Sequence, residues 1–312
     1  MTATVCVPLT ALGRYLGGAT MTATVCVPLT FERLALRGAL PGCRVVRTGM
    51  GPRRARAAGA AAGLARSGAI VAGVAGGLDP RVRPGDIVVA TEVRAGAAVT
   101  PVPSAPLLAG AVRRLGLPVH TGPVICTTTV AGGPALARLA ATGALAVEME
   151  AAALAEAAGG APFAVVRAVL DTTAHPLLRP GTPARALRAL ANLRRVAPAV
   201  RQWAAATGER QVVLASARSS VRVVAGQVDL VLVVGSTDSS NSLRLVEVAA
   251  RAGAAAAHLV QDAGDVDLGW LAGARRVGIT AGASTPPQLV DGLLGCLAGL
   301  GPVTLREPRA VG

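Results

Sequence analysis

The sequence is poor in aromatic side chains and contains no lysine. Two tryptophans, one tyrosine and two phenylalanines occur among 312 residues, so the core has to be built from Ala, Val and Leu by close backbone packing. Arginine supplies all 31 basic side chains against 17 acidic ones, and the formal net charge is +14. A basic surface of this kind favours ligands that carry phosphate.

Aromatic platforms for stacked bases are missing beside the basic residues. The arginine pairs are scattered along the chain and have almost no aromatic neighbours: Arg53-Arg54, Arg113-Arg114, Arg194-Arg195 and Arg275-Arg276. Proteins that bind single strands need aromatic side chains for stacking as well as positive charge. We therefore expect no nucleic-acid partner.

The cysteines lack the spacing of a metal site or a disulfide framework. There are five of them, Cys6, Cys26, Cys43, Cys126 and Cys296, without a CxxC pair. The N-terminus has no basic segment before a long apolar run, and no uninterrupted apolar stretch reaches the length of a bilayer span. We expect a cytoplasmic protein without a metal site.

A decapeptide, MTATVCVPLT, occurs twice, at residues 1–10 and 21–30. Each copy predicts a strand, but only one can open the sheet, and the second leads directly into the rest of the chain. We expect the fold to begin at Met21. Residues 1–20 are then an edge strand, a disordered arm or a consequence of a misplaced start site.

Acidic residues cluster between Ala144 and Asp171. An apolar strand, an alanine-rich helix and a second apolar strand follow one another there, which predicts a βαβ unit with buried parallel strands. Glu148 and Glu150 follow the first strand and Asp171 ends the second, and ligands of such sheets bind beyond the carboxyl ends of the strands. The alternative is that the glutamates only favour the helix dipole and the aspartate caps a turn.

These segments resemble the signature of a known superfamily. V-E-M-E-A-A-A-L-A and P-F-A-V-V-R-A-V-L-D are similar to motifs of the nucleoside phosphorylases and methylthioadenosine/S-adenosylhomocysteine nucleosidases. The segment A-G-V-A-G-G-L-D-P-R-V-R-P-G-D-I-V-V-A-T-E-V, at 72–93, resembles a second motif. The resemblance covers about 22–207. It implies an α/β fold with a mixed sheet flanked by helices, cleavage of N-glycosidic bonds, and a homo-oligomer.

The resemblance also implies roles for the acidic residues. Asp171 is the candidate general acid for the departing base. Glu150, with Glu148 and Met149, is expected to bind the ribose and to favour its cationic state. Glu32 lies where the nucleosidases have a glutamate that activates water; its alternative is an exposed acid in a first helical turn.

Two glycine pairs are the candidate phosphate site. Thr48–Pro52 lies where the superfamily has a glycine turn near the phosphate or ribose, and Gly49 and Gly51 precede a predicted helix. Free backbone N–H groups converge at such a turn. Gly76 and Gly77 belong to the next predicted turn.

Three departures from the superfamily pattern make the expected pocket more apolar. Val74 stands where a hydroxyl residue is common, Val130 where a base-stacking aromatic is expected, and Leu170 where a serine commonly precedes the catalytic aspartate. The pattern resembles the hopanoid-associated phosphorylases. It implies phosphorolysis of an adenosyl-linked isoprenoid lipid, with inorganic phosphate as co-substrate, no other cofactor, and peripheral membrane contact through the lipid. Hydrolysis of a nucleoside is the alternative.

The alternation of strands and helices restarts at Gln211. Strands are predicted at 211–216, 229–235, 256–260 and 276–280, with an expected second module at 208–305 and a tail at 306–312. V-L-V-V-G-S-T-D-S-S-N-S-L-R-L (231–245) and V-G-I-T-A-G-A-S-T-P (277–286) closely resemble the C-terminal part of 4-hydroxy-3-methylbut-2-enyl diphosphate reductase. The resemblance covers about 219–297 and implies a small α/β domain with a parallel sheet.

In that family these loops hold a diphosphate. The resemblance assigns this role to Ser239, Ser240, Asn241 and Ser284, at two helix N-termini. The alternative is that they are only helix caps. The family's iron–sulfur cluster takes one cysteine from each of three domains, and this chain has only the last, so no cluster is expected. The module is then accessory or vestigial, and a reductase-related or purely binding protein is the alternative function.

Overall fold

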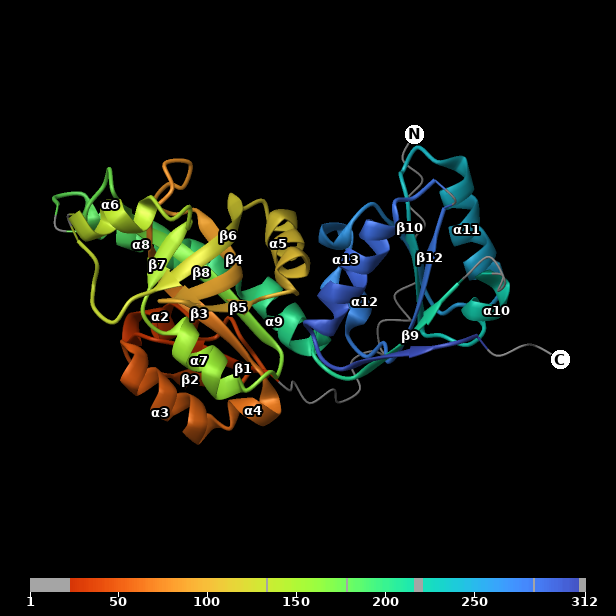
Figure 1. Cartoon of the computed structure of the whole chain (residues 1–312), viewed down its shortest axis with the longest axis horizontal. Coiled ribbons are helices and arrows are strands. Elements are labelled where there is room, and N and C mark those ends of the chain that lie inside the picture. The colour runs from red at the N-terminus through yellow and green to blue at the C-terminus, as the bar shows by residue number, and fades with distance from the viewer. Residues whose placement is uncertain (1–22, 133, 178, 216–220, 283, 309–312) are drawn as a thin grey trace.

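A computed structural model describes residues 23–132, 134–177, 179–215, 221–282 and 284–308. The first decapeptide and the expectation for residues 1–20 lie outside this part of the chain. The second decapeptide forms the strand β1 (Thr24–Val27), as predicted. Figure 1 shows two α/β modules side by side, with helices packed on both sheets.

The first module is built on a mixed sheet of eight described strands, as expected. They are β1, β2 (Val45–Arg47), β3 (Ala69–Gly77), β4 (Ile87–Ala95), β5 (Ala98–Pro101), β6 (Val119–Cys126), β7 (Ala146–Glu148) and β8 (Phe163–Thr172). Strand β3 pairs with both β7 and β8, β8 pairs with β4, and β4 joins β6, which pairs with β7. These five strands therefore close into a ring.

The predicted parallel βαβ unit is wrong. Strand β3 pairs antiparallel with β7 and parallel with β8, so β7 and β8 run in opposite directions. Their ends still meet, because β7 has only three residues, about 10 Å of chain. Gly76 of β3 lies between Val147 of β7 and Asp171 of β8, which brings the residues that follow β7 to the end of β8.

Helices cover this sheet on its outer surfaces. They are α2 (Thr30–Leu36), α3 (Pro52–Ala62), α4 (Leu64–Ser67), α5 (Ala105–Arg114), α6 (Pro134–Ala140), α7 (Ala151–Ala158), α8 (Thr182–Arg195) and α9 (Ala197–Ala206). Gly63, which adopts a left-handed conformation, separates α3 from α4. Thr182 is the first residue of α8, and its hydroxyl donates to the carbonyl of Leu177.

Small residues let the layers approach closely, as the composition predicts. Gly59 of α3 faces α7, where an added Cβ would lie 2.8 Å from the Cβ of Ala157 and 3.3 Å from a methyl carbon of Leu154. Trp203 of α9 is fully buried, and its indole N–H donates to Ser104. The core between sheet and helices is otherwise Ala, Val and Leu.

The second module is a parallel sheet in the order β11-β10-β12-β9-β13, as expected. Its strands are β9 (Arg210–Leu214), β10 (Leu230–Val234), β11 (Ala257–Val260), β12 (Arg276–Ala281) and β13 (Val303–Arg306), the last of which was not predicted. Its helices are α10 (Val221–Ala225), α11 (Ser240–Arg251), η2 (Ala263–Asp265), α12 (Leu268–Leu271) and α13 (Pro287–Ala298).

The two modules share a closely packed interface. Helices α5 and α9 pack on η2, α12 and α13. Arg114 donates to the carbonyls of Gly264 and Val266 at 3.1 and 2.9 Å. A Cβ on Gly110 would lie 1.9 Å from the Gly264 carbonyl oxygen, so that position requires glycine. Buried Arg210 donates to carbonyls at the ends of both α9 and α12.

Helices α2, α6 and α8 lie at the end of the first module that faces away from the second (Figure 1).

None of the helices in the described ranges is long and apolar enough to cross a bilayer.

Candidate active site

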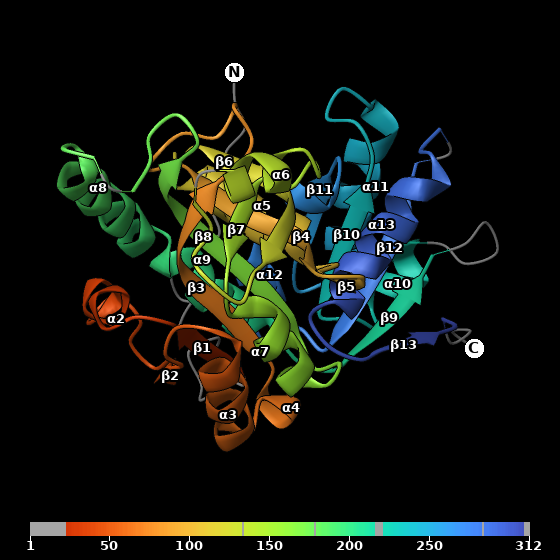
Figure 2. The ribbon, with the colours of Figure 1, turned by 60° about the vertical axis from the view of Figure 1, so that its left-hand side comes forward.

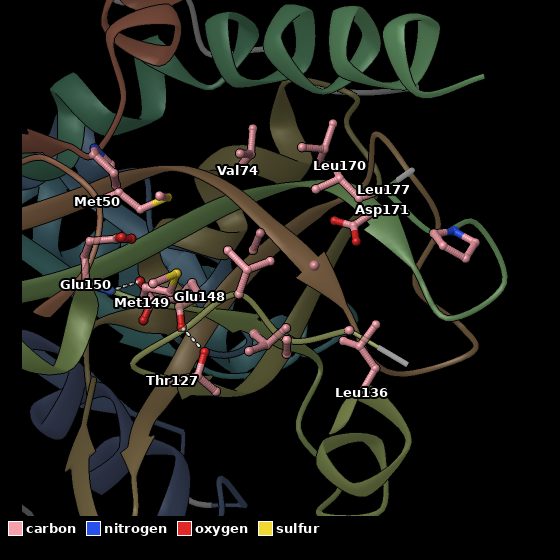
Figure 3. A pocket seen from close by; sticks show the side chains of 18 of the residues that line it. Met50, Val74, Thr127, Leu136, Glu148, Met149, Glu150, Leu170, Asp171 and Leu177 are labelled. Atoms are coloured by element: carbon pink, nitrogen blue, oxygen red, sulfur yellow. Dashed lines mark hydrogen bonds between the residues drawn. The ribbon is translucent and has the colours of Figure 1, made fainter. Parts of the chain in front are cut away.

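A cavity of about 650 Å³ opens where β3, β7 and β8 end. This is within the size range of small-molecule sites. Six of the predicted site residues line it: Glu32, Gly76, Glu148, Met149, Glu150 and Asp171. Figure 3 shows Asp171 across the cavity from Glu148, which ends β7, and from Met149 and Glu150, which follow it. The two acids at 150 and 171 therefore face one cavity.

Glu150 is held by two partners from distant parts of the chain. Its Oε1 accepts the backbone N–H of Gly51 at 2.9 Å, and its Oε2 lies 3.4 Å from a guanidinium nitrogen of Arg167. Burial raises the pKa of the Glu150 carboxyl, and the Arg167 charge opposes this. Gly51 has a φ of 90°, which glycine adopts without strain, and this turns its amide towards the carboxylate.

Glu148 anchors the start of α7. Its carboxylate accepts the backbone N–H groups of Glu150 and Ala151, the guanidinium of Arg167 and the thiol of Cys126. The helix-start role, which was the alternative for this residue, is therefore observed, although Glu148 also lines the cavity. Its hydrogen bonds hold the backbone from which Glu150 projects.

Arg167 was not among the predicted site residues. It lies in the middle of β8, is 0% exposed, and its charge is met by Glu148 and Glu150. A buried guanidinium is costly unless it is paired, so the lone arginine in the apolar segment F-A-V-V-R-A-V-L-D was the signal that could have identified it.

Glu32 is 1% exposed, so the alternative of an exposed acid is wrong. Its carboxylate accepts the backbone N–H groups of Val74 and Leu29, both at 2.7 Å. Burial raises the pKa of Glu32 to about 7, although Arg167 and the two amides act in the opposite direction. An added Cβ on Gly73 would lie 2.6 Å from both Glu32 and Arg167, so the absence of a side chain there makes room for the pair.

Asp171 ends β8 beside Gly76 and is partly buried. Burial raises the pKa of its carboxyl, and the charge of Arg185 partly opposes this. A carboxyl with a raised pKa retains its proton closer to neutral pH, which a general acid requires.

The rest of the cavity wall is largely apolar. Val74, Val130 and Leu170, the three departures from the superfamily pattern, all line it together with Leu136 and Leu177. Figure 3 shows Leu170 and Leu177 beside Asp171. The expectation that these substitutions face the pocket is confirmed.

The four candidate glycines are placed differently from one another. Gly76 lines the cavity, whereas the described lining does not include Gly49, Gly51 or Gly77. Gly76 and Gly77 end strand β3 and do not form the predicted turn. The amide of Gly51 is engaged by Glu150.

The candidate diphosphate residues lie in the second module, away from this cavity. The Ser239 hydroxyl caps α11 by accepting the backbone N–H of Ser242 at 3.3 Å, while Ser240, Asn241 and Ser284 are exposed. The alternative that Ser284 caps a helix is wrong, because Pro286 occupies the cap position of α13. The neighbouring Thr285 hydroxyl donates to the Val234 carbonyl.

The module's cysteine does not fit an iron–sulfur cluster. Cys296 is buried in α13, and burial raises its thiol pKa to about 11, which disfavours the thiolate that binds iron. It is the only cysteine in the sequence of this module.

Comparison with known proteins assigns the first module to a family. The profile of the family described as "Phosphorylase superfamily" matches residues 34–201, more than half of the chain. The chain belongs to the phosphorylase superfamily. It shares its fold with the 5'-methylthioadenosine/S-adenosylhomocysteine nucleosidase of Neisseria meningitidis (TM-score 0.50, 23% identity, 57% of this chain and 98% of that one). A futalosine hydrolase of Helicobacter pylori strain 26695 is similar as well (TM-score 0.51, 13% identity, 57% and 95%).

The second module matches a different family. The profile described as "LytB protein" matches residues 205–298. The 4-hydroxy-3-methylbut-2-enyl diphosphate reductase of Nocardia farcinica is 56% identical over 93 residues, 30% of this chain and 26% of that protein. The reductase of Mycolicibacterium paratuberculosis is 50% identical over 111 residues (34% and 31%). The chain thus spans between a quarter and a third of these relatives, and both resemblances found in the sequence are confirmed.

Proposed function

We propose that this protein hydrolyses the N-glycosidic bond of a nucleoside that carries an apolar substituent. The observation that carries the proposal is the convergence of Glu32, Glu150 and Asp171 on one cavity, from three separate elements of the fold. Cleavage of this bond places positive charge on the ribose and negative charge on the departing base, and carboxyl groups in different protonation states serve both.

The proton for the leaving base comes from Asp171. Its raised pKa keeps the carboxyl closer to the protonated state, and a proton or hydrogen bond given to the base stabilises the charge that develops there. The Arg167 charge and the Gly51 amide favour the ionised form of Glu150, which then accepts hydrogen bonds from the ribose hydroxyls and favours the cationic ring. Met149 beside it packs against the sugar face.

The nucleophile is a water molecule that Glu32 deprotonates. A base with a pKa near 7 combines a usable ionised fraction with enough basicity at neutral pH. Phosphate is disfavoured as the nucleophile, because four carboxyl groups line the cavity and would repel an anion. Phosphorolysis is the second candidate, favoured by the superfamily match and by the +14 charge of the chain.

The apolar substituent follows from the cavity wall. Leu170 and Leu177 lie beside the general acid, and Val74, Val130 and Leu136 extend the apolar surface of the cavity. An adenosyl group attached to an isoprenoid lipid such as a hopanoid has this combination of a base, a ribose and an apolar body.

The test is adenine release from adenosyl-hopane, methylthioadenosine and adenosine, with and without inorganic phosphate. Hydrolysis predicts free sugar at a rate that phosphate does not change. Release that depends on phosphate and yields a sugar 1-phosphate would replace hydrolysis by phosphorolysis. No release from any of the three, by a folded protein, would contradict both.

A further inference from the structure

Exposed apolar side chains gather around the mouth of the cavity. Of the nine large hydrophobic side chains that are exposed in the described residues, six belong to this end of the first module: Phe31, Leu34, Met50, Val130, Leu177 and Leu187. Met50, Val130 and Leu177 line the cavity itself. The other three come from the neighbouring helices α2 and α8, and we call them the rim residues.

Contacts place α2 and α8 beside the mouth. Glu32 of α2 lines the cavity, and α8 follows the lining residue Leu177 closely in the chain. Arg194 of α8 donates to carbonyls of α2 and its C-cap at 3.0 and 2.9 Å. Leu187 is seven residues before Arg194, two helical turns, and therefore lies on the same side of α8. Figure 2 turns this end of the molecule towards the reader.

Two segments that contribute to the mouth are rich in arginine and contain no acidic residue of their own. Between residues 33 and 78 there are eight arginines and no aspartate or glutamate, and between residues 172 and 208 there are six and again none. Arg33, Arg53, Arg179 and Arg188 among them are exposed. Arg56 of the first segment pairs with exposed Glu156, and four further carboxyl groups line the cavity itself. The outer surface here is both apolar and cationic.

We propose that this face docks on an anionic lipid bilayer. Exposed apolar side chains gain free energy by entering the boundary between headgroups and acyl chains, and arginines gain it from lipid phosphates. A second copy of the chain would bring two cationic faces together, which is unfavourable. An acidic polymer would pair with the arginines but leave Phe31, Leu34 and Leu187 in water.

Docking in this orientation points the mouth at the membrane. The second module lies at the opposite end of the molecule and stays clear of the bilayer (Figure 1). A lipid-linked nucleoside could then enter the cavity without its apolar part crossing water. This consequence rests on the proposed function, whereas the docking itself does not.

The test is flotation of the full chain with vesicles, measured without a nucleoside. We expect binding to phosphatidylcholine vesicles that contain phosphatidylglycerol, little binding to phosphatidylcholine alone, and a decrease as salt is raised. Replacing the rim residues together (Phe31→Ser, Leu34→Ser, Leu187→Ser), which are 44%, 58% and 70% exposed, should lower the partition constant about tenfold or more.

A matched control changes three equally exposed side chains elsewhere. Val99→Ser, Leu243→Ser and Leu305→Ser, at 55%, 48% and 58% exposure, should leave binding unchanged. Leu243 has arginine neighbours too, so this control separates a specific face from general stickiness. Thermal melting tests whether both triple variants are folded. Adenine release from soluble adenosine tests whether the reaction proceeds independently of vesicles.

Three outcomes would overturn the docking. The first is that the full chain does not float with anionic vesicles. The second is an equal loss of binding in the rim and control variants. The third is that the chain binds RNA, or associates with itself, through the rim residues and does not bind vesicles. Failure of adenine release with intact vesicle binding would instead contradict only the proposed reaction.

Discussion

The carboxyl ends of the strands differ between the two modules. In the first, Glu32 and Glu150 are held by backbone N–H groups 42 and 99 residues away, and their carboxylates face an open cavity. In the second, the Ser239 hydroxyl is bonded to an amide three residues away, and the Thr285 hydroxyl to the end of β10. Both sets of residues lie at the edge where such sheets bind ligands.

This contrast shows when polar residues at a sheet edge make a site. A serine at a helix start is satisfied by its own helix, which costs little and leaves nothing to bind. A buried carboxylate cannot be satisfied locally and needs partners from other elements, and these orient it. In this protein, the two buried carboxylates Glu32 and Glu150 are therefore oriented by amides from other elements.

The largest effect is expected from Asp171→Asn. The amide cannot donate a proton to the leaving base as an acid does, so the rate of adenine release should fall by a factor of about 100 to 10,000. Asp291→Asn, on the exposed face of α13, is the matched control and should be unchanged. Equal activity of the two variants would remove Asp171 from the mechanism.

Glu32 should produce the pH dependence of the reaction. A base acts when ionised, so kcat/KM should rise as pH increases and level off above the Glu32 pKa of about 7. In Glu32→Gln the rate should fall by about 100-fold or more and this rise should disappear. Glu156→Gln, which changes an exposed residue of α7, should keep the rise. The pKa of Glu32 lies in the range, roughly pH 5 to 8, in which histidine usually titrates. A wild-type kcat/KM that does not change over this range would argue against Glu32 as the base.

Arg167→Met tests the long-range partners themselves. It leaves Glu148 and Glu150 buried without their counter-charge, and the free energy of unfolding should fall by about 3–5 kcal/mol at neutral pH. The loss should be smaller in acid, because protonation of the buried carboxyls removes the unpaired charge. Denaturant titrations at two pH values measure it; a loss independent of pH would point to packing alone.

The smallest effect is expected from Ser239→Ala. Removal of the α11 cap should lower the free energy of unfolding by about 1 kcal/mol and leave adenine release unchanged. Isothermal titration with inorganic pyrophosphate extends the test. Binding by the wild type that is lost in this variant would show that the second module is also a site, and the contrast between the modules would fail.

Much of the fold was predictable because burial patterns are local. The apolar segments that become β3, β8, β10 and β12 are recognisable as buried strands without any knowledge of their neighbours. Strand direction was not predictable from the same patterns. The short β7 pairs antiparallel with β3, and that choice depends on a partner seventy residues away in the chain.

The candidate site was predictable in part for a related reason. Glu150 and Asp171 stand at strand ends, where ligands of α/β sheets bind, so their position in the sequence marks them. Arg167 stands inside an apolar strand, and Glu32 inside a helix that sequence alone could equally leave exposed. Their importance comes from the charges and amides around them, which are contributed by other elements.

The sequence by itself determined the two-module organisation, the apolar strands and the carboxyl groups available for chemistry, because composition and periodicity are properties of short segments. Only the tertiary structure decided which of those carboxyls remain available to a ligand. The protonation and orientation of Glu32 and Glu150 depend on one buried guanidinium and on distant backbone amides, because the electrostatic cost of burying a carboxylate is set by its neighbours in space.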